Sequence, residues 1–332
     1  MSEELIKNRS EIVFLYDVHL ANPNGDAYDN TPRVTSDNIN LVTDVRLKRT
    51  IRDYIKRHGK GEIFMDKVPK KDNPTESYTR EELIARENID WTNPKDKEKL
   101  FLKFVDLRLF GCLLYKERKR ASGKTKGEKE EQSQKEEAGE ALTQLGPVQF
   151  SIGYSLHPVE TIGLPITCVV PSKMEKARGG AFGSKEILRY SLICFGGIVN
   201  ENVGKETGLT EADRRLLLEA LWLGTKEVIT KNQAPRLLLH IIYKEDSFHI
   251  GQLDTRIKGD CDPNHPPTTI KEIAINLTDL INVLKKFQSK VEVIEYLIDP
   301  AVTLSYAGKQ YPATEIERLL ATTQIPVRKL EF

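Results

Sequence analysis

The order of the apolar segments between residues 12 and 243 restricts the possible fold more than any other feature of the chain. Residues 12–20 (IVFLYDVHL) and 237–243 (LLLHIIY) are short runs of β-branched, aromatic and leucine side chains, the pattern of strands buried inside a sheet. Residues 147–155 alternate apolar and polar side chains, and 166–170 and 187–195 are two further apolar runs. The chain is therefore expected to build a sheet from segments far apart in the sequence.

Two amphipathic helices are expected between these strands. The first begins near Thr43 or Asp44, either of which can cap it, and its apolar residues recur at helical spacing until Gly59. The second covers residues 210–226, with a threonine as its cap. The resulting strand–helix–strand–strand–helix–strand order predicts an α+β fold of the ferredoxin-like class, which includes the RNA-recognition modules.

The remaining segments are assigned by composition. Residues 62–105 contain three prolines and no clear period, which is typical of an irregular insertion. Residues 116–140 are rich in charges of both signs and lack large apolar residues, which indicates a mobile surface loop. Residues 270–332 are expected to form a helical extension, with a helix at 273–287 that has one apolar face.

Composition excludes several classes of protein. The net charge is +1, 30% of the residues are charged, and no run of 18 apolar residues occurs, so no membrane partner is expected. The N-terminus is acidic where a signal peptide is basic, which favours a cytoplasmic protein. The four cysteines form no CxxC pair and are expected to be reduced thiols.

One helix concentrates positive charge. From Arg46 to Lys60 there are seven lysines or arginines and a single acid, Asp53. Lysine or arginine at 48, 52 and 56 recurs every four residues and therefore lines one helical face, which lies away from the apolar stripe and should be open to a ligand. Such a face suits phosphate binding. A charged, solvated helix surface is the alternative explanation.

A second basic segment covers residues 171–186. It combines lysines and an arginine with Met174, Phe182 and three glycines. A hairpin of this composition can follow a phosphate backbone and stack on a base. The alternative is a mobile loop that carries ordinary surface lysines.

Signals for catalysis or metal binding are weak. Asp17 and His19 share one face of a strand, and Asp260, Cys261, Asp262 and His265 cluster in a proline-rich loop without a known ligand spacing. The GxSxG, HExxH and Walker motifs are absent from the sequence. No catalytic residue, metal or cofactor is therefore expected.

Several segments together resemble a known family. DVHLANPNGD, LVTDVRLKRTIRDY, GPVQFSIGYSLHPVE, YSLICFGGIVNEN and PRLLLHIIYKEDSFHIGQLD are similar to the Cas7 family, the backbone subunit of the CRISPR Cascade complex in the repeat-associated RNA-binding superfamily. The type I-B and I-C branches are the most similar. The matching segments cover most of residues 10–255.

The resemblance implies an architecture and a function. An RNA-recognition-like palm would cover residues 10–255, with a finger-like insertion at 62–105 and a thumb hairpin at 157–190. Copies would stack head to tail along one guide RNA (crRNA) within an antiviral Cascade complex that contains further subunits. They would hold the crRNA backbone and leave its bases free to pair with target DNA.

The resemblance also implies which residues bind RNA. The palm residues would be Asn22, Asn24, Arg33, Arg46, Lys48, Arg49, Arg52 and Lys56. The thumb residues would be Lys173, Met174, Lys176, Arg178, Phe182 and Lys185, with Met174 or Phe182 as the wedge that displaces a base. Two alternatives remain: an RNA endonuclease of the same superfamily, in which Glu175 is the only acid near the middle of the hairpin, and a subunit that binds only proteins.

Overall fold

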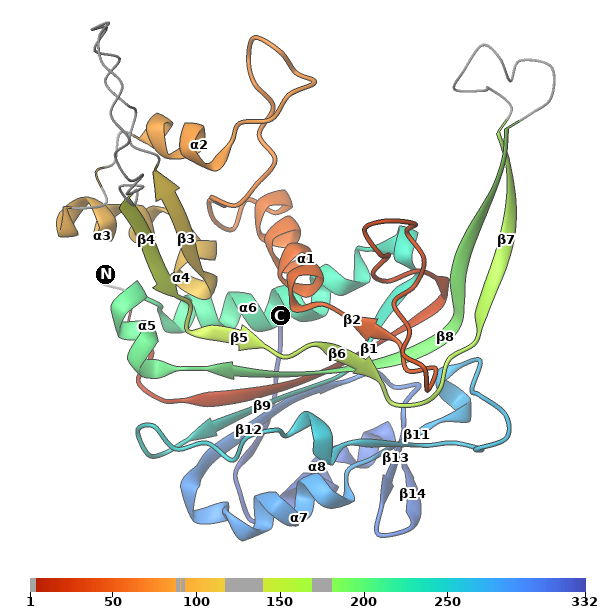
Figure 1. The fold of residues 1–332 in the computed structure, drawn as a ribbon. Coiled ribbons are helices and arrows are strands. Elements are labelled where there is room, and N and C mark those ends of the chain that lie inside the picture. The colour runs from red at the N-terminus through yellow and green to blue at the C-terminus, as the bar shows by residue number, and fades with distance from the viewer. Residues whose placement is uncertain (1–3, 88–89, 91–92, 117–139, 169–180) are drawn as a thin grey trace, which may run out of the picture.

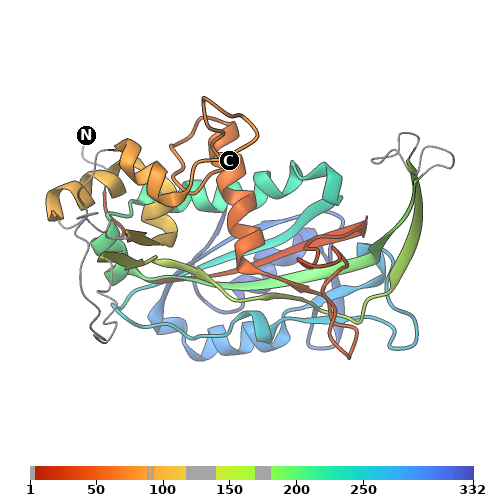
Figure 2. The same ribbon diagram turned by 45° about the horizontal axis from the view of Figure 1, so that its top comes forward.

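The computed structural model describes residues 4–87, 90, 93–116, 140–168 and 181–332. Within this part of the chain, one large twisted sheet lies between two layers (Figure 1). Helices cover one face of the sheet, and the C-terminal residues cover the other (Figure 2). The protein thus combines helices and strands, as the sequence predicts, but its strands form several sheets.

The large sheet is built around a central strand near the N-terminus. In spatial order its strands are β15 (Val327–Lys329), β12 (Val291–Ile298), β9 (Gln233–Tyr243), β1 (Ser10–Ala21), β8 (Ala181–Val199), β6 (Gly153–Ser155) and β2 (Leu41–Val42), and both β5 (Val148–Phe150) and β7 (Thr161–Cys168) also pair with β8. The strand predicted at 147–155 is therefore two short strands. Every pair from β12 to β2 is antiparallel.

Two helices pack side by side on one face of the sheet, α1 (Asp44–Arg57) and α6 (Glu211–Lys226). Their caps are those expected from the sequence. The Thr43 side chain accepts a hydrogen bond from the Arg46 amide, and Thr210 forms a capping box with Asp213. The apolar stripe of α1, which includes Leu47 and Ile51, is buried against the sheet.

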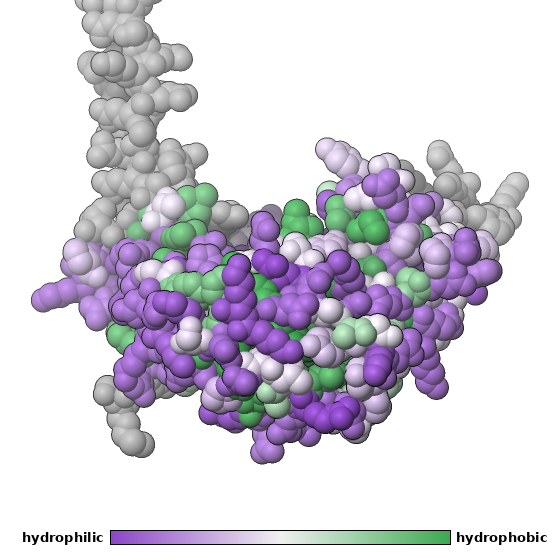
Figure 3. Space-filling model, turned by 90° about the horizontal axis from the view of Figure 1, so that it is seen from below, coloured by the Kyte–Doolittle hydropathy of each residue, from purple (hydrophilic) through white to green (hydrophobic). Residues whose placement is uncertain are grey.

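The opposite face of the sheet is covered by the C-terminal layer. This layer contains β10 (Lys258–Asp260), β11 (Ala274–Asn276), α7 (Thr278–Lys286), β13 (Thr303–Tyr306), β14 (Lys309–Pro312) and α8 (Ile316–Ala321). Four of these strands form a sheet in the order β10, β11, β13, β14. Figure 3 shows that the outer face of the layer is mostly hydrophilic.

The prediction of a helical extension over residues 270–332 is wrong. The expected helix at 273–287 begins as strand β11 and becomes α7 only at Thr278. Val291–Ile298, with valines and isoleucines at short spacing, joins the edge of β9, and Val327–Lys329 joins beyond it. Val291, Ile294 and Tyr296 are buried in the core beneath the sheet, and this packing favours a strand.

The insertion before β5 is more regular than the sequence predicts. It contains α2 (Arg80–Glu87), α3 (Pro94–Lys103), α4 (Val105–Phe110) and the separate hairpin of β3 (Gly111–Lys116) and β4 (Glu140–Leu145). Outside the insertion, α5 (Glu201–Thr207) contacts α4. Its own small core includes Phe64, Phe101 and Leu114. Most of the charged loop expected at 116–140 lies outside the described residues.

The region predicted as a thumb is a long hairpin. Strand β7 pairs with the first half of β8, and the second half of β8 continues into the large sheet beside β1. The hairpin rises from the same side of the sheet as α1 and the insertion (Figure 1). Residues 169–180 lie outside the described part of the chain.

A buried histidine holds the base of this hairpin. The Nδ1 atom of His157 lies 2.7 Å from the Pro158 carbonyl oxygen, and its Nε2 atom accepts a hydrogen bond from the Leu192 amide at 3.1 Å. Only a neutral ring can both donate to the carbonyl and accept from the amide. Burial lowers the pKa of His157 below its usual 6.5, against the opposing effect of the Pro158 carbonyl.

We therefore expect the free energy of unfolding to fall as the pH drops below 6.5, where the unfolded chain takes up a proton that the folded ring excludes. Urea denaturation on both sides of this pH would measure the loss. His157→Gln should make this pH-dependent loss of stability smaller. The loss that remains would come from His240, because burial also lowers the pKa of that histidine. The exposed His19 provides the control, and an equal reduction in His19→Gln would contradict the assignment.

None of the helices in the described residues combines the length and the apolar character needed to span a bilayer.

Candidate nucleic-acid interface

The loop after β1 fixes the N-terminal end of α1. The Oδ1 atom of Asn24 accepts hydrogen bonds from both the amide and the hydroxyl of Thr43, each at 2.8 Å. Asn22 is buried, and its Nδ2 atom donates to the Asn30 carbonyl oxygen at 2.7 Å. These two predicted site residues therefore position the loop and the first turn of the helix.

The basic face of α1 is less open than the sequence predicts. Four of its cations have carboxylate partners. Lys48 pairs with Asp44 at 2.9 Å, Arg49 with Asp53 at 2.6 Å and Asp66 at 3.2 Å, Arg52 with Asp106 at 2.9 Å, and Lys56 with Asp66. Two of these acids, Asp66 and Asp106, come from the insertion that folds over the helix. The net positive charge of this face is therefore small.

Arg52 and Asp106 form the most enclosed of these pairs. The Asp106 carboxylate is fully buried and also accepts hydrogen bonds from the amides of Phe64 at 2.8 Å and Met65 at 3.1 Å. The Arg52 guanidinium lies 4.9 Å from the centre of the Phe110 ring. This arrangement joins α1 to the insertion and gives Arg52 a structural role.

Three other cations lie together, and no carboxylate of the described residues pairs with them. Arg46 lies in the first turn of α1, Lys231 ends a short 3-10 turn (Ile229–Lys231), and Lys185 lies on β8 within the hairpin. Within the described residues, none of their side chains forms a hydrogen bond or an ion pair, and the Nε atom of Arg46 is buried without a partner. We call Arg46, Lys185 and Lys231 the cation cluster.

The sheet register brings the cation cluster together. Val18 pairs with Gln233, and the amide of His19 donates to the Asn232 carbonyl at 3.2 Å, so the turn of Lys231 lies beside the end of β1. Ala21 pairs with Leu188 on the other side, three residues after Lys185. Burial lowers the pKa of the Lys231 ammonium, and the positive charges of Arg46 and Lys185 lower it further.

The other predicted residues are placed as follows. Arg33 lies 3.6 Å from Asp26, and its Nε atom is buried without a partner. Lys185 is exposed within the hairpin. Lys173, Met174, Lys176 and Arg178 lie outside the described residues, as does the side chain of Phe182. Lys231 was missed, because a single lysine before a buried strand gives no signal in the sequence.

The weak catalytic signals belong to structural contacts. Asp17 is buried between Arg236 at 2.8 Å and Tyr190 at 3.0 Å, whereas His19 is exposed. Burial raises the pKa of Asp17, although Arg236 and Tyr190 oppose the shift. The described residues contain no group of three histidine, cysteine or acidic side chains that could hold a metal ion.

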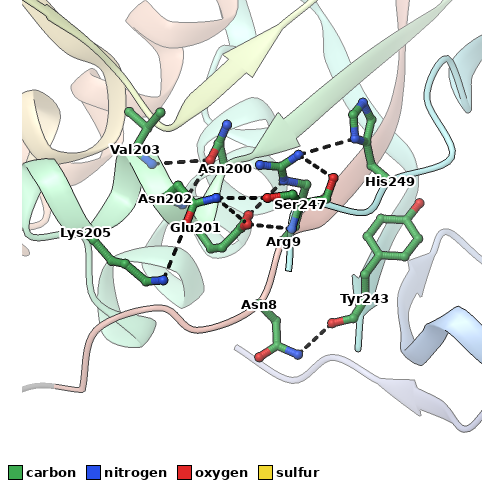
Figure 4. A network of polar contacts seen from close by, with 10 residues as sticks. All are labelled: Asn8, Arg9, Asn200, Glu201, Asn202, Val203, Lys205, Tyr243, Ser247 and His249. Atoms are coloured by element: carbon green, nitrogen blue, oxygen red, sulfur yellow. Dashed lines mark hydrogen bonds and ion pairs between the residues drawn. The ribbon is translucent and has the colours of Figure 1, made fainter. Parts of the chain in front are cut away.

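A polar network at the other end of β1 shows the contrast with the cation cluster (Figure 4). Arg9 donates to the buried Glu201 carboxylate at 2.8 Å and to the Ser247 carbonyl at 2.9 Å, and the Ser247 amide donates to Glu201 at 2.8 Å. The buried charges of Arg9 and Glu201 therefore neutralise each other. The network ties the N-terminal segment to α5.

Comparisons with known proteins agree with this architecture. A family model described as CRISPR-associated protein Cas7 matches residues 8–278. A Haloferax volcanii protein described as "CRISPR-associated protein Cas7" is 28% identical over 325 residues, which cover 93% of this chain and 92% of that protein. A solved chain from a "CRISPR RNA-guided surveillance complex, pre-nicking" shares the fold, with a TM-score of 0.50, 13% identity, and coverage of 95% of this chain and all of that one.

These matches place the protein among the CRISPR-associated proteins. Because the family model covers most of its length, the chain belongs to the Cas7 family. The family resemblance found in the sequence is thereby confirmed.

Proposed function

We propose that this protein is the crRNA-binding backbone subunit of a type I CRISPR surveillance complex. Its copies would stack head to tail along the crRNA, hold its phosphates, and present its bases to target DNA. The cation cluster is the observation that carries the proposal. Arg46 and Lys231 are partly buried, and no carboxylate in the described part of the chain supplies the counter-charge that a phosphate would bring. Membership of the Cas7 family supports the same interpretation.

The proposal includes the finer architecture expected from the sequence. The antiparallel order β9, β1, β8, β6, with α1 and α6 on one face, supports a ferredoxin-like or RNA-recognition palm. Residues 10–255 would be this palm, with the finger at 62–105 and the thumb at 157–190. The similarity of its motifs to the type I-B and I-C branches favours one of these subtypes.

The contribution of each palm cation to phosphate binding would depend on whether it already has a carboxylate partner. Arg46 and Lys231 would bind phosphate most strongly, since binding relieves their mutual repulsion. Arg33 would follow. Lys48, Arg49, Arg52 and Lys56 would contribute less, because a phosphate must compete with the carboxylates of Asp44, Asp53, Asp66 and Asp106. Asn22 and Asn24 would position the loop and the start of α1 at the RNA surface.

The thumb would complete the channel. Lys173, Lys176, Arg178 and Lys185 would contact the RNA backbone, and Met174 or Phe182 would displace a base. The mechanism is electrostatic and geometric, so the subunit itself would not be catalytic. It would work in the cytoplasm together with the other subunits of the complex. Head-to-tail contacts join different surfaces of each copy and so build an open filament.

A stoichiometry experiment tests the proposal. Purified protein is mixed with single-stranded RNAs of increasing length at low salt, and the complexes are weighed by mass photometry. The number of bound copies should rise in proportion to RNA length, and the RNA should remain intact. Failure to bind RNA would support a subunit that binds only proteins. Cleavage of the RNA that disappears in Glu175→Gln would support the endonuclease alternative.

A further inference from the structure

Two large apolar side chains are exposed beside the cation cluster. Leu20, near the end of β1, is 50% exposed, and Ile229, in the same turn as Lys231, is 81% exposed. A third exposed leucine, Leu164, is 42% exposed and pairs across the hairpin with Lys185. Exposed apolar side chains and cations therefore share this turn and this hairpin.

The backbone at this junction is held in an unfavourable conformation. Leu20 has φ of 49° and Asn232 has φ of 45°, a left-handed region that leucine rarely adopts. The two segments are tied together by hydrogen bonds, from the His19 amide to the Asn232 carbonyl at 3.2 Å and from the Asn232 side chain to the His19 carbonyl at 2.6 Å. Such strain persists where the surrounding structure enforces it, and it concentrates at ligand-binding sites.

The cation cluster beside Leu20 and Ile229 indicates which kind of partner this surface binds. An apolar partner that covered Leu20 and Ile229 would also bury Arg46 and Lys231, which lack counter-charges, and this would be costly. A single-stranded nucleic acid satisfies both kinds of side chain, because its phosphates carry negative charge and its riboses and bases present apolar faces.

We propose that Leu20 and Ile229 form an apolar platform on the palm that contacts the riboses or base faces of the crRNA, while Arg46, Lys185 and Lys231 hold the adjacent phosphates. This inference rests on the proposed function and adds to it a second kind of contact. The platform lies on the palm, so it acts separately from any wedge at the tip of the thumb. It would fix the path of each nucleotide next to the phosphates.

The salt dependence of binding separates the two kinds of contact. Leu20→Gly/Ile229→Ser should weaken binding of a labelled oligouridine by about tenfold at every salt concentration, because it removes apolar contact area and no charge. The log–log salt slope should remain that of the wild type. The melting temperature should not fall, since glycine adopts a positive φ freely and Ile229 is exposed.

The matched control is Leu113→Ser/Leu145→Ser. These leucines are 57% and 61% exposed on the β3–β4 hairpin, at the other end of the molecule (Figure 1). This variant should bind RNA as the wild type does. Ile229→Ser alone serves as a second test that is independent of the strained backbone.

Three results would overturn the inference. If wild-type protein binds RNA and the platform variants bind it equally well, only the platform is wrong. If the wild type binds no RNA, the proposed function fails as well. If the platform variants bind RNA normally but lose self-association in mass photometry without RNA, the two side chains contact a second copy of the chain.

Discussion

Replacing Arg46 and Lys231 by glutamine is expected to weaken crRNA binding by roughly 100-fold at low salt. A hydrogen bond to a charged group contributes about 1.5–3 kcal/mol, so the removal of two phosphate-binding groups can account for a change of this size. The log–log slope of affinity against salt should flatten by about 0.7 for each phosphate of the single strand that the variant no longer neutralises. Fluorescence anisotropy of a labelled crRNA across a salt series would measure both quantities.

The same double substitution should leave the free protein at least as stable as the wild type. Burial and the neighbouring cations lower the pKa of Lys231, so its charged form is less favourable than in water until a phosphate binds. Removing that charge relieves repulsion in the folded state. Urea denaturation without RNA would measure this, and a clear loss of stability would mean that the two cations serve the fold.

Two comparison variants make the result specific. Lys309→Gln/Lys329→Gln removes the same charge from exposed lysines on β14 and β15, and it should leave the salt slope almost unchanged. Lys48→Ala/Arg49→Ala/Arg52→Ala removes three cations that already have carboxylate partners, so its slope should change by less than three neutralised phosphates would predict. If the salt slope changed by the full amount in the triple variant and not at all in Arg46→Gln/Lys231→Gln, the cations of α1 with carboxylate partners would be the main phosphate-binding groups.

Local periodicity explains the parts of the fold that the sequence predicts. The apolar stripe of α1 and the Thr43 cap lie within one stretch of chain, and the predicted helix agrees with Asp44–Arg57. Strands β1 and β9 are continuous apolar runs because they lie inside the sheet and are buried on both faces. The C-terminal region was misassigned because short apolar segments fit a helix or a strand equally well until their neighbours are known.

The electrostatics of the site depend on contacts that no local pattern contains. Asp66 and Asp106 neutralise α1 from positions that are 17 and 54 residues from their partners Arg49 and Arg52. Lys231 joins Arg46 and Lys185 only through the pairing of β1 with β8 and β9. The sequence identifies the cations, whereas the register decides which of them lack a counter-charge.

The second large effect concerns the contact between α1 and the insertion. Asp106→Ala should lower the free energy of unfolding by about 3–5 kcal/mol, because it leaves Arg52 uncompensated while its guanidinium is largely buried. It also removes the acceptor for the amides of Phe64 and Met65. Urea denaturation of the full chain would measure the loss. Because the unpaired amides remain, removing Arg52 as well should restore only part of the stability.

The control is Asp44→Ala, which breaks the more exposed pair with Lys48 on the same helix and should cost less than about 1 kcal/mol. A similarly small loss in Asp106→Ala would mean that the separate core around Phe64 and Phe101 holds the insertion in place without the ion pair. If Asp106→Ala lowers stability as expected and leaves RNA affinity nearly unchanged in the surviving folded protein, Arg52 serves the fold. The predicted basic face of α1 would then consist mainly of cations that attach the insertion to the palm, with the RNA held at the cation cluster.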